Sequence, residues 1–177
     1  DLFPEAIRLI KEIQPRAVML ENVRGFLDSG FDEYREQIFR SIRELGYVTH
    51  IKLLNASDYG VPQLRPRVVI IGIRKDQYGA FSYPDEHADG APSVGEILYD
   101  LMKQNGWTGA KTWAQNANRI APTLVGGSKK HGGPDLGPTR ARNAWAELGV
   151  DGRGIANAAP EQDFVGMPRL TSRMMAR

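Results

Sequence analysis

Apolar residues recur every three or four positions in several stretches of this chain, and this spacing predicts amphipathic helices. The predicted helices are one that follows Asp1, one from about Asp32 to Gly46, one from about Ser93 to Asn105, and a short one from Thr139 to Leu148. Two of them carry local signals. Gly46 is well suited to stop a helix, and Ser93 followed by Glu96 makes a capping box.

Three other stretches predict strands. Residues 17–20 form a short apolar run that reads as a buried strand ending at Glu21, and residues 47–55 read as a second strand. Residues 68–73 are β-branched and almost uninterrupted, which favours a well-covered strand. No helix pattern separates the last two strands, so we expect them to be antiparallel neighbours that end an otherwise parallel sheet. The alternation of helices and strands indicates the α/β class, with a doubly wound, Rossmann-like sheet.

The amino-acid composition of the chain changes after Tyr83. Glycine, proline and single aromatic residues dominate, so we place a domain boundary near residues 83 and 84. Three tryptophans in the later part (Trp107, Trp113 and Trp145) are expected to form a small core, because tryptophan buries a large area. The glycine-rich stretch 126–133 contains Lys129 and Lys130. It is either a DNA-contacting loop or a simple surface loop, and it lacks the spacing of a nucleotide P-loop.

Composition narrows the possible chemistry. The chain has 177 residues, a formal net charge of +2 and no cysteine, which excludes disulfides, thiolate metal sites and a thiol nucleophile. Residues 119–142 hold five Lys or Arg against one Asp, which suggests a polyanionic partner, although solvated surface charge gives the same pattern. We see no signal peptide and no apolar run that could span a membrane. The chain does not begin with Met, and we expect it to be part of a longer protein.

Two groups of polar residues stand beside the predicted strands. Glu21 is placed where a strand end would open into a ligand crevice, although a strand-end Glu that caps a turn has the same pattern. Arg65 and Arg67 lie two residues apart on an extended segment and are expected to point the same way. Two guanidinium groups beside a buried strand need acidic or polar partners. These partners are either a ligand or surface acids such as Asp58.

The order and spacing of these groups closely resemble the cytosine carbon-5 DNA methyltransferases. The resemblance runs almost without a break from about residue 2 to residue 75 and resumes near the end of the chain. It rests on Leu20-Glu21-Asn22-Val23, Leu45-Gly46-Tyr47, the run from Leu54 to Gln63, Arg65-x-Arg67, and Pro168-Arg169-Leu170-Thr171-x-Arg173.

The resemblance implies specific roles for these residues. Glu21 would contact the ring nitrogen and exocyclic amine of a flipped-out cytosine, Arg67 would hold its carbonyl oxygen, and Arg65 would brace the pocket and a phosphate. The other residues implied to bind substrate are Asn22, Val23, Gln63, Arg169, Thr171 and Arg173, together with Lys129 and Lys130 in the glycine-rich loop. Arg169, Thr171 and Arg173 would also organise the recognition domain. Asn55 is the single residue of this chain assigned to the cofactor, S-adenosylmethionine.

The same resemblance implies a division of the chain. Residues 1–83 would be part of a catalytic domain, residues 84–167 a target recognition domain, and residues 168–177 the start of a return into the catalytic domain. The expected partner is double-stranded DNA, with no membrane or metal partner, and the parent protein is expected to be monomeric, cytoplasmic and associated with a bacterial or phage-like nucleoid. Accompaniment by a restriction enzyme is possible in this family.

The chain also departs from the family pattern. The family's cysteine nucleophile and its glycine-rich cofactor motif precede this segment and are missing from it, so we predict that the isolated chain is inactive. Three functions remain open. The chain is part of a DNA cytosine methyltransferase, a non-catalytic DNA-binding module or split-enzyme half, or part of an RNA-directed relative.

Overall fold

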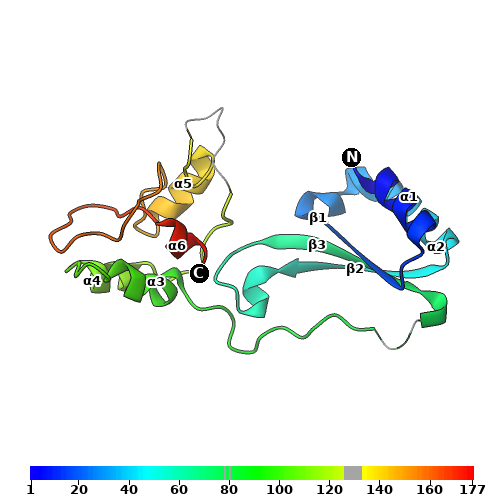
Figure 1. The fold of residues 1–177 in the computed structure, drawn as a ribbon, viewed down its shortest axis with the longest axis horizontal. Coiled ribbons are helices and arrows are strands. Elements are labelled where there is room, and N and C mark those ends of the chain that lie inside the picture. The colour runs from blue at the N-terminus through cyan, green and yellow to red at the C-terminus, as the bar shows by residue number, and fades with distance from the viewer. Residues whose placement is uncertain (78, 80, 126–132) are drawn as a thin grey trace. The chain divides into compact units, whose positions relative to one another are not determined.

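The protein is a mixed α/β structure of two compact units. The computed structural model describes residues 1–77, 79, 81–125 and 133–177. One unit comprises Asp1–Asn55 and Pro66–Asp85, and the other comprises Ala56–Arg65 and Glu86–Arg177. The helices and strands of the first unit are α1 (Phe3–Ile13), β1 (Ala17–Val23), α2 (Asp32–Glu44), β2 (Tyr47–Asn55) and β3 (Pro66–Arg74) (Figure 1). The helices of the second unit are α3 (Val94–Met102), α4 (Ala110–Asn116), α5 (Thr139–Ala146) and α6 (Ser172–Met175).

The first unit is built on a three-stranded sheet with the order β1-β3-β2. The predicted antiparallel pairing of β2 with β3 is confirmed, with Ile51 opposite Ile70. The prediction that the first strand is a parallel strand is wrong, because β1 pairs antiparallel with β3 and Leu20 also lies opposite Ile70. The apolar sequence of β3 explains its central place. It must be covered on both edges and both faces, and its Val68 and Ile70 are fully buried.

The two faces of the sheet differ in their cover. On one face, Val18 and Leu20 of β1 and two buried residues of β3 pack in a cluster with the helices α1 and α2. The members of this cluster from β3 and the helices include Val68, Ile70, Ile10 and Ile42. On the other face the segment after β3 covers β2. There Phe81 lies 5.1 Å from the His50 ring, and the Tyr83 hydroxyl donates to the Val69 carbonyl at 3.0 Å.

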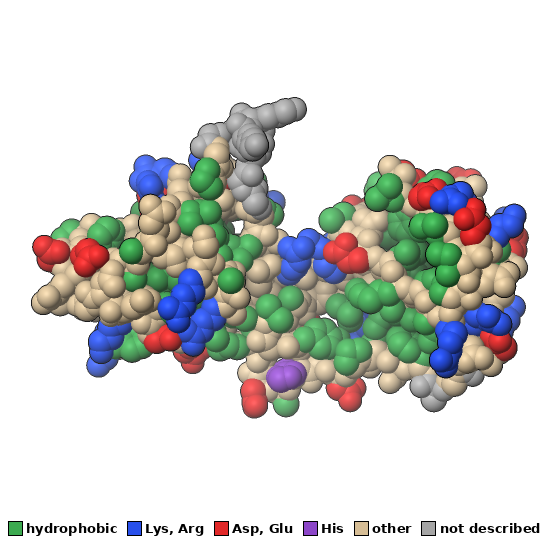
Figure 2. Space-filling view, viewed as in Figure 1, with side chains coloured by type: hydrophobic (Ala, Val, Ile, Leu, Met, Phe, Trp, Pro, Cys, Tyr) green, Lys and Arg blue, Asp and Glu red, His purple; other side chains and the backbone are tan. Residues whose placement is uncertain are grey.

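Strand β1 is an edge strand and not the buried strand that its apolar sequence predicts. Its burial alternates along the strand, with Met19 67% and Val23 56% exposed. Figure 2 shows hydrophobic side chains gathered on the visible face over this unit. The strand also extends to Val23, so Glu21 lies within it and not at its end. A short apolar run does not distinguish a central strand from an edge strand, so the prediction that residues 17–20 form a buried strand was wrong.

The second unit has a separate core made largely by its helices. All three tryptophans are buried in it, which confirms the prediction for them, together with Met102, Leu136, Val150 and Leu170. Helix α3 starts at the predicted capping box, where Ser93 Oγ accepts from the Glu96 backbone N–H at 3.2 Å. Helix α5 lies where predicted. Helices α4 and α6 were not predicted, because seven and four residues are too few to show a helical period.

The loop between β2 and β3 belongs to the second unit. Leu64 N–H donates to the Ala121 carbonyl at 2.8 Å, and Ala121 N–H donates to the Pro62 carbonyl at 3.1 Å. The Thr123 hydroxyl also donates to the Leu64 carbonyl. The chain therefore enters the second unit twice, once through residues 56–65 and again from residue 86. Within the described residues, no helix has both the length and the apolar character needed to cross a membrane.

Candidate functional site

Glu21 and Arg67 form an ion pair on one face of the sheet. Residues 21 and 69 are opposite each other, and so are residues 23 and 67, so Arg67 is the diagonal neighbour of Glu21 on the same face. Arg67 Nε donates to Glu21 Oε1 at 2.5 Å. The Arg67 side chain is 23% exposed and the Glu21 side chain is 51% exposed. The arginine fork therefore meets a carboxylate, as its half-buried position requires, and that carboxylate is Glu21.

The Arg67 guanidinium is held from a second side. Its Nη1 donates to the carbonyl of Pro66 at 2.9 Å. Asn22 uses its side-chain oxygen locally, accepting from the Val23 N–H at 2.8 Å. Glu21, Asn22 and Val23 all border a cavity of about 330 Å³ that runs beside the start of α1. The Glu21 carboxylate thus stands at an open part of the surface, while Arg67 is the more covered and more fixed member.

This pairing suits a ligand that presents a donor and an acceptor side by side. A carboxylate accepts hydrogen bonds, or donates one when protonated, and a guanidinium has five N–H donors and no acceptor. An ion pair as exposed as this one contributes about 1 kcal/mol or less. Separating the two groups is therefore cheap enough for a planar polar ligand to enter between them.

The other residues that the sequence assigned to the cytosine and cofactor sites are divided between the two units. Asn55 is half-buried at the last position of β2, opposite Pro66. Gln63 and Arg65 belong to the second unit, where Gln63 forms an isolated bridge with Ala121 and the Arg65 carbonyl accepts from the Ala56 N–H at 3.3 Å. A half-buried Asn55 by itself does not make a site for a nucleoside cofactor.

A separate polar cluster surrounds Asp151 in the second unit. Asp151 Oδ1 accepts from Arg153 Nε at 2.8 Å, and Asp151 Oδ2 accepts from Arg169 Nε at 3.0 Å. The Asp151 side chain is only 12% exposed, whereas those of Arg153 and Arg169 are 72% and 47% exposed. Hydrogen bonds from Arg153, and then from Arg169, hold the pKa of the Asp151 carboxyl well below its usual range, against an opposing effect of desolvation. Asp151 therefore anchors both arginines in its ionised form.

Two glycines that follow Asp151 permit close approaches of other residues. A Cβ atom on Gly154 would lie 2.9 Å from Arg169 Nη1, and one on Gly152 would lie 3.2 Å from the Arg142 Cα. Sequence reasoning selected Arg169 but missed Asp151. The only local signal for it was the Asp-Gly-Arg-Gly sequence at residues 151–154, whose two glycines permit the close approach.

Thr171 and Arg173 have different environments from Arg169. Thr171 Oγ1 accepts from the Met174 N–H at 3.2 Å and so caps α6. The Arg173 guanidinium has no hydrogen bond or ion pair to any other residue that the structure describes. Lys129 and Lys130, also predicted to contact substrate, lie outside the described residues.

Comparison with known proteins identifies the family. Residues 1–150 match the family described as C-5 cytosine-specific DNA methylase. The chain belongs to this family. It is 52% identical over 179 aligned residues to Type II methyltransferase M.NaeI of Lentzea aerocolonigenes, and 46% identical over 180 to Type II methyltransferase M.NgoMIV of Neisseria gonorrhoeae.

Both alignments cover the whole of this chain but only 43% and 57% of those two relatives, so the chain spans about half their length. Type II methyltransferase M.FnuDI of Fusobacterium nucleatum is 46% identical over 84 residues, which is 47% of this chain and 24% of that protein. The resemblance inferred from the motifs is thereby confirmed at the level of the family.

Proposed function

We propose that this chain is part of a DNA (cytosine-5-)-methyltransferase that transfers a methyl group from S-adenosylmethionine to carbon 5 of a flipped cytosine in duplex DNA. Membership of the C-5 cytosine-specific DNA methylase family supports the reaction class. The observation that carries the assignment of residues is the Glu21–Arg67 pair, in which an acid and a cation lie 2.5 Å apart on one sheet face.

The Watson–Crick edge of cytosine complements such a pair. Cytosine presents an exocyclic amine, a ring nitrogen and a carbonyl oxygen in a row, and an extruded base exposes all three. Glu21 would contact the amine and the ring nitrogen, while Arg67 would donate to the carbonyl oxygen. The two side chains would separate slightly to receive the base, at the small cost estimated above.

The same contacts would activate the ring. Nucleophilic attack on a ring carbon drives electrons toward the ring nitrogen and the carbonyl oxygen. A protonated Glu21 at the nitrogen and the fixed cation of Arg67 at the oxygen would stabilise this developing negative charge. Arg65 would brace the pocket and a phosphate, and Asn22, Val23 and Gln63 would contact the substrate.

The remaining chemistry must be supplied from outside this chain. A cysteine nucleophile cannot come from a sequence that contains no cysteine. S-Adenosylmethionine would supply the methyl group, and Asn55 is the one residue here that we assign to its site. We therefore propose that the 177-residue chain does not methylate DNA alone and that a longer protein does. That protein would act in a restriction-modification setting in the cytoplasm, as a monomer.

We further propose that residues 84–167, nearly all of which lie in the second unit, form the target recognition domain. Its sequence carries the basic stretch 119–142, and contacts from Arg and Lys to phosphates position a protein on DNA. Lys129 and Lys130 would contribute to that contact. Arg169 would act there through Asp151, as a residue that positions neighbouring segments.

The test is formation of 5-methylcytosine in DNA by a longer protein that contains this chain, compared with its Glu21→Ala and Arg67→Ala variants. Each variant should lose about 100-fold in turnover, the cost of removing one stabilising group from a developing charge, with little change in duplex affinity. Arg8→Ala is a matched control, because Arg8 also pairs with carboxylates in the same unit but far from this pair in sequence. Equal losses in turnover and in DNA affinity for Glu21→Ala would show a structural role. No 5-methylcytosine from the unmodified longer protein would refute the function itself.

A further inference from the structure

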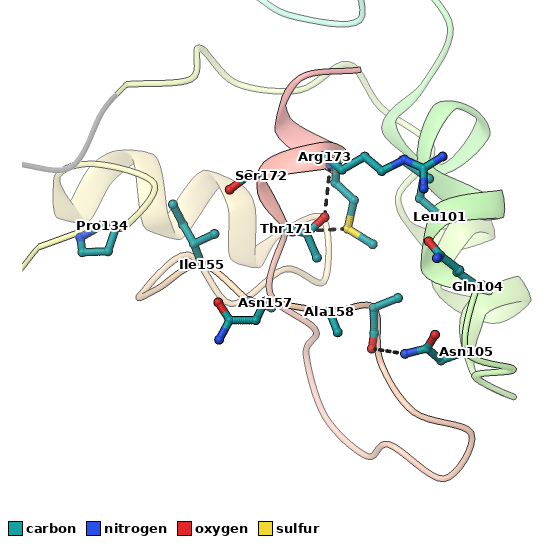
Figure 3. A pocket seen from close by; sticks show the side chains of 13 residues that line it. Leu101, Gln104, Asn105, Pro134, Ile155, Asn157, Ala158, Thr171, Ser172 and Arg173 are labelled. Atoms are coloured by element: carbon teal, nitrogen blue, oxygen red, sulfur yellow. Dashed lines mark hydrogen bonds between the residues drawn. The ribbon is translucent and has the colours of Figure 1, made fainter.

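A cavity of about 550 Å³ lies in the second unit between α3, α6 and the segment 155–159. Figure 3 shows it at close range, with Leu101, Gln104 and Asn105 on the side of α3. Its size falls in the range of about 300–1,000 Å³ that is usual for ligand pockets. The lining of this cavity includes neither Glu21 nor Arg67, the residues of the proposed cytosine contacts.

The lining of the cavity is positively charged. Its described members include one cation, Arg173, and no Asp or Glu. The other residues that line it are Leu101, Gln104, Asn105, Pro134, Ile155, Ala156, Asn157, Ala158, Ala159, Thr171, Ser172 and Met174. With a single uncompensated guanidinium in the wall, the cavity favours an anion over a neutral or cationic ligand.

Among the residues that the structure describes, Arg173 is the arginine of the Arg-Leu-Thr-x-Arg element that has no carboxylate partner. Arg169 is bound to the Asp151 carboxylate, and Thr171 is committed to the cap of α6. By contrast, Arg173 is exposed and has no partner among the residues that the structure describes. Figure 3 shows its side chain extending toward the α3 side of the cavity, the side that also holds Gln104.

Gln104 adds a neutral donor beside this charge. Within the described part of the chain its side-chain amide makes no hydrogen bond, whereas the neighbouring Asn105 is committed to the Ala159 carbonyl at 3.0 Å and to Glu161. A guanidinium and an amide that line one cavity without a carboxylate match the oxygens of a phosphate group, to which arginine binds with two parallel hydrogen bonds.

We propose that this cavity binds a backbone phosphate of DNA through Arg173 and Gln104, and that Arg169 and Thr171 only position the segment that carries Arg173. The inference rests on the proposed function, since it takes DNA as the partner. It adds a contact in the second unit that is separate from Glu21 and Arg67, and it divides the Arg-Leu-Thr-x-Arg element into one binding residue and two positioning residues.

The test is binding of a fluorescein-labelled, cytosine-containing duplex to the 177-residue chain by anisotropy, over a series of salt concentrations. Arg173→Gln should weaken binding by about threefold to tenfold at low salt and reduce the slope of log Kd against log salt by about 0.9, the value for one lost phosphate contact. Arg173→Lys should keep the slope, because it keeps the charge.

A matched pair of substitutions checks the cavity itself. Gln104→Glu places a negative charge in the wall and should weaken binding about as much as Arg173→Gln. Gln115→Glu makes the same change at an exposed position of α4, outside the lining of this cavity, and should have a smaller effect. An unchanged salt slope for Arg173→Gln, or equal effects of the two glutamates, would overturn the proposal.

Further outcomes distinguish DNA from a free phosphate as the ligand, and failure of this inference from failure of the proposed function. Binding of inorganic phosphate or cytidine monophosphate through Arg173, with no effect of Arg173→Gln on the duplex, would overturn DNA as the source. If the longer protein makes 5-methylcytosine while Arg173→Gln leaves duplex binding unchanged, this inference fails and the proposed function stands. If the Arg173 effects are found but the longer protein does not methylate DNA, the proposed function fails and the phosphate contact of Arg173 stands.

Discussion

Asp151 and Arg169 are joined by a hydrogen bond of 3.0 Å between a nearly buried carboxylate and a half-exposed guanidinium. The two residues are 18 positions apart, and the Asp151 N–H also donates to the Pro168 carbonyl at 2.9 Å. The carboxylate thus fixes the start of the segment that carries Thr171 and Arg173. The Asp151 carboxylate therefore has a structural role in the second unit.

Replacing Asp151 with Asn should destabilise the second unit by about 1–3 kcal/mol at neutral pH, because the charge-assisted hydrogen bonds from Arg153 and Arg169 weaken. Folding lowers the pKa of this carboxyl, so its stabilisation is fully present above the unfolded pKa of about 3.9. It is lost as the pH falls from there through the folded value. The difference in the free energy of unfolding between the unmodified chain and Asp151→Asn should therefore close below about pH 4.

Chemical denaturation at several pH values measures this gap. Asp76→Asn is the control, since Asp76 also pairs with an arginine but is 53% exposed, and its effect should be the smaller one. A gap that stays constant down to pH 2 would contradict the linkage.

Replacing Arg67 with Lys should separate charge from geometry. Lysine keeps the positive charge but not the planar fork that donates to both Glu21 and Pro66. In a longer protein we expect turnover to fall by about 10-fold to 100-fold, with an unchanged salt dependence of DNA binding. Arg8→Lys should change neither quantity. Full turnover by Arg67→Lys would show that a point charge is sufficient.

Gly95 should not tolerate alanine. A Cβ atom at this position would lie 2.0 Å from the Ala114 carbonyl oxygen, and a backbone atom cannot rotate away. We expect a loss of about 1–3 kcal/mol in the free energy of unfolding, from separation of α3 and α4. Gly30→Ala is the control, because nothing lies within 4 Å of its new Cβ atom. Thermal melting that ranks the two variants equally would contradict the close packing of these helices.

The exposed edge of β1 should promote self-association of the 177-residue chain. A long edge strand with apolar side chains is a template for pairing with another strand, and charge on the edge opposes this. Met19→Lys should lower the associated fraction in sedimentation velocity at a fixed concentration. Val165→Lys makes the same kind of change at a residue that is 92% exposed in the other unit. If both substitutions act equally, net charge and not the edge is responsible.

The elements with local signals could be predicted from sequence. Helix α3 follows from Ser93 and Glu96, the end of α2 follows from Gly46 with its positive φ of 91°, and the β2–β3 pair follows from the lack of a helix between the strands. The direction and the exposure of β1 could not be predicted. A strand's neighbours are decided by distant residues, and Ala17–Val23 carries no mark of its partner.

The candidate site divides in the same way. The motif spacing selected Glu21 and Arg67, and the sheet register brings them together. The motif also assigned Arg169, Thr171 and Arg173 one common role, although their contacts in the structure differ. Asp151 escaped notice because a single acidic residue becomes informative only when its partners, 2 and 18 residues away, are seen around it.

The membership of residues 56–65 in the second unit has a consequence for exchanging that unit between related enzymes. A chimera joined at one point near residue 85 would transplant Ala121 and Thr123 without the Pro62 and Leu64 carbonyls that accept their hydrogen bonds. The hairpin loop and the C-terminal segment would then have to match by chance. Exchanging this unit for that of a relative therefore calls for two inserted segments, residues 56–65 and the part from residue 86, taken together from the same donor.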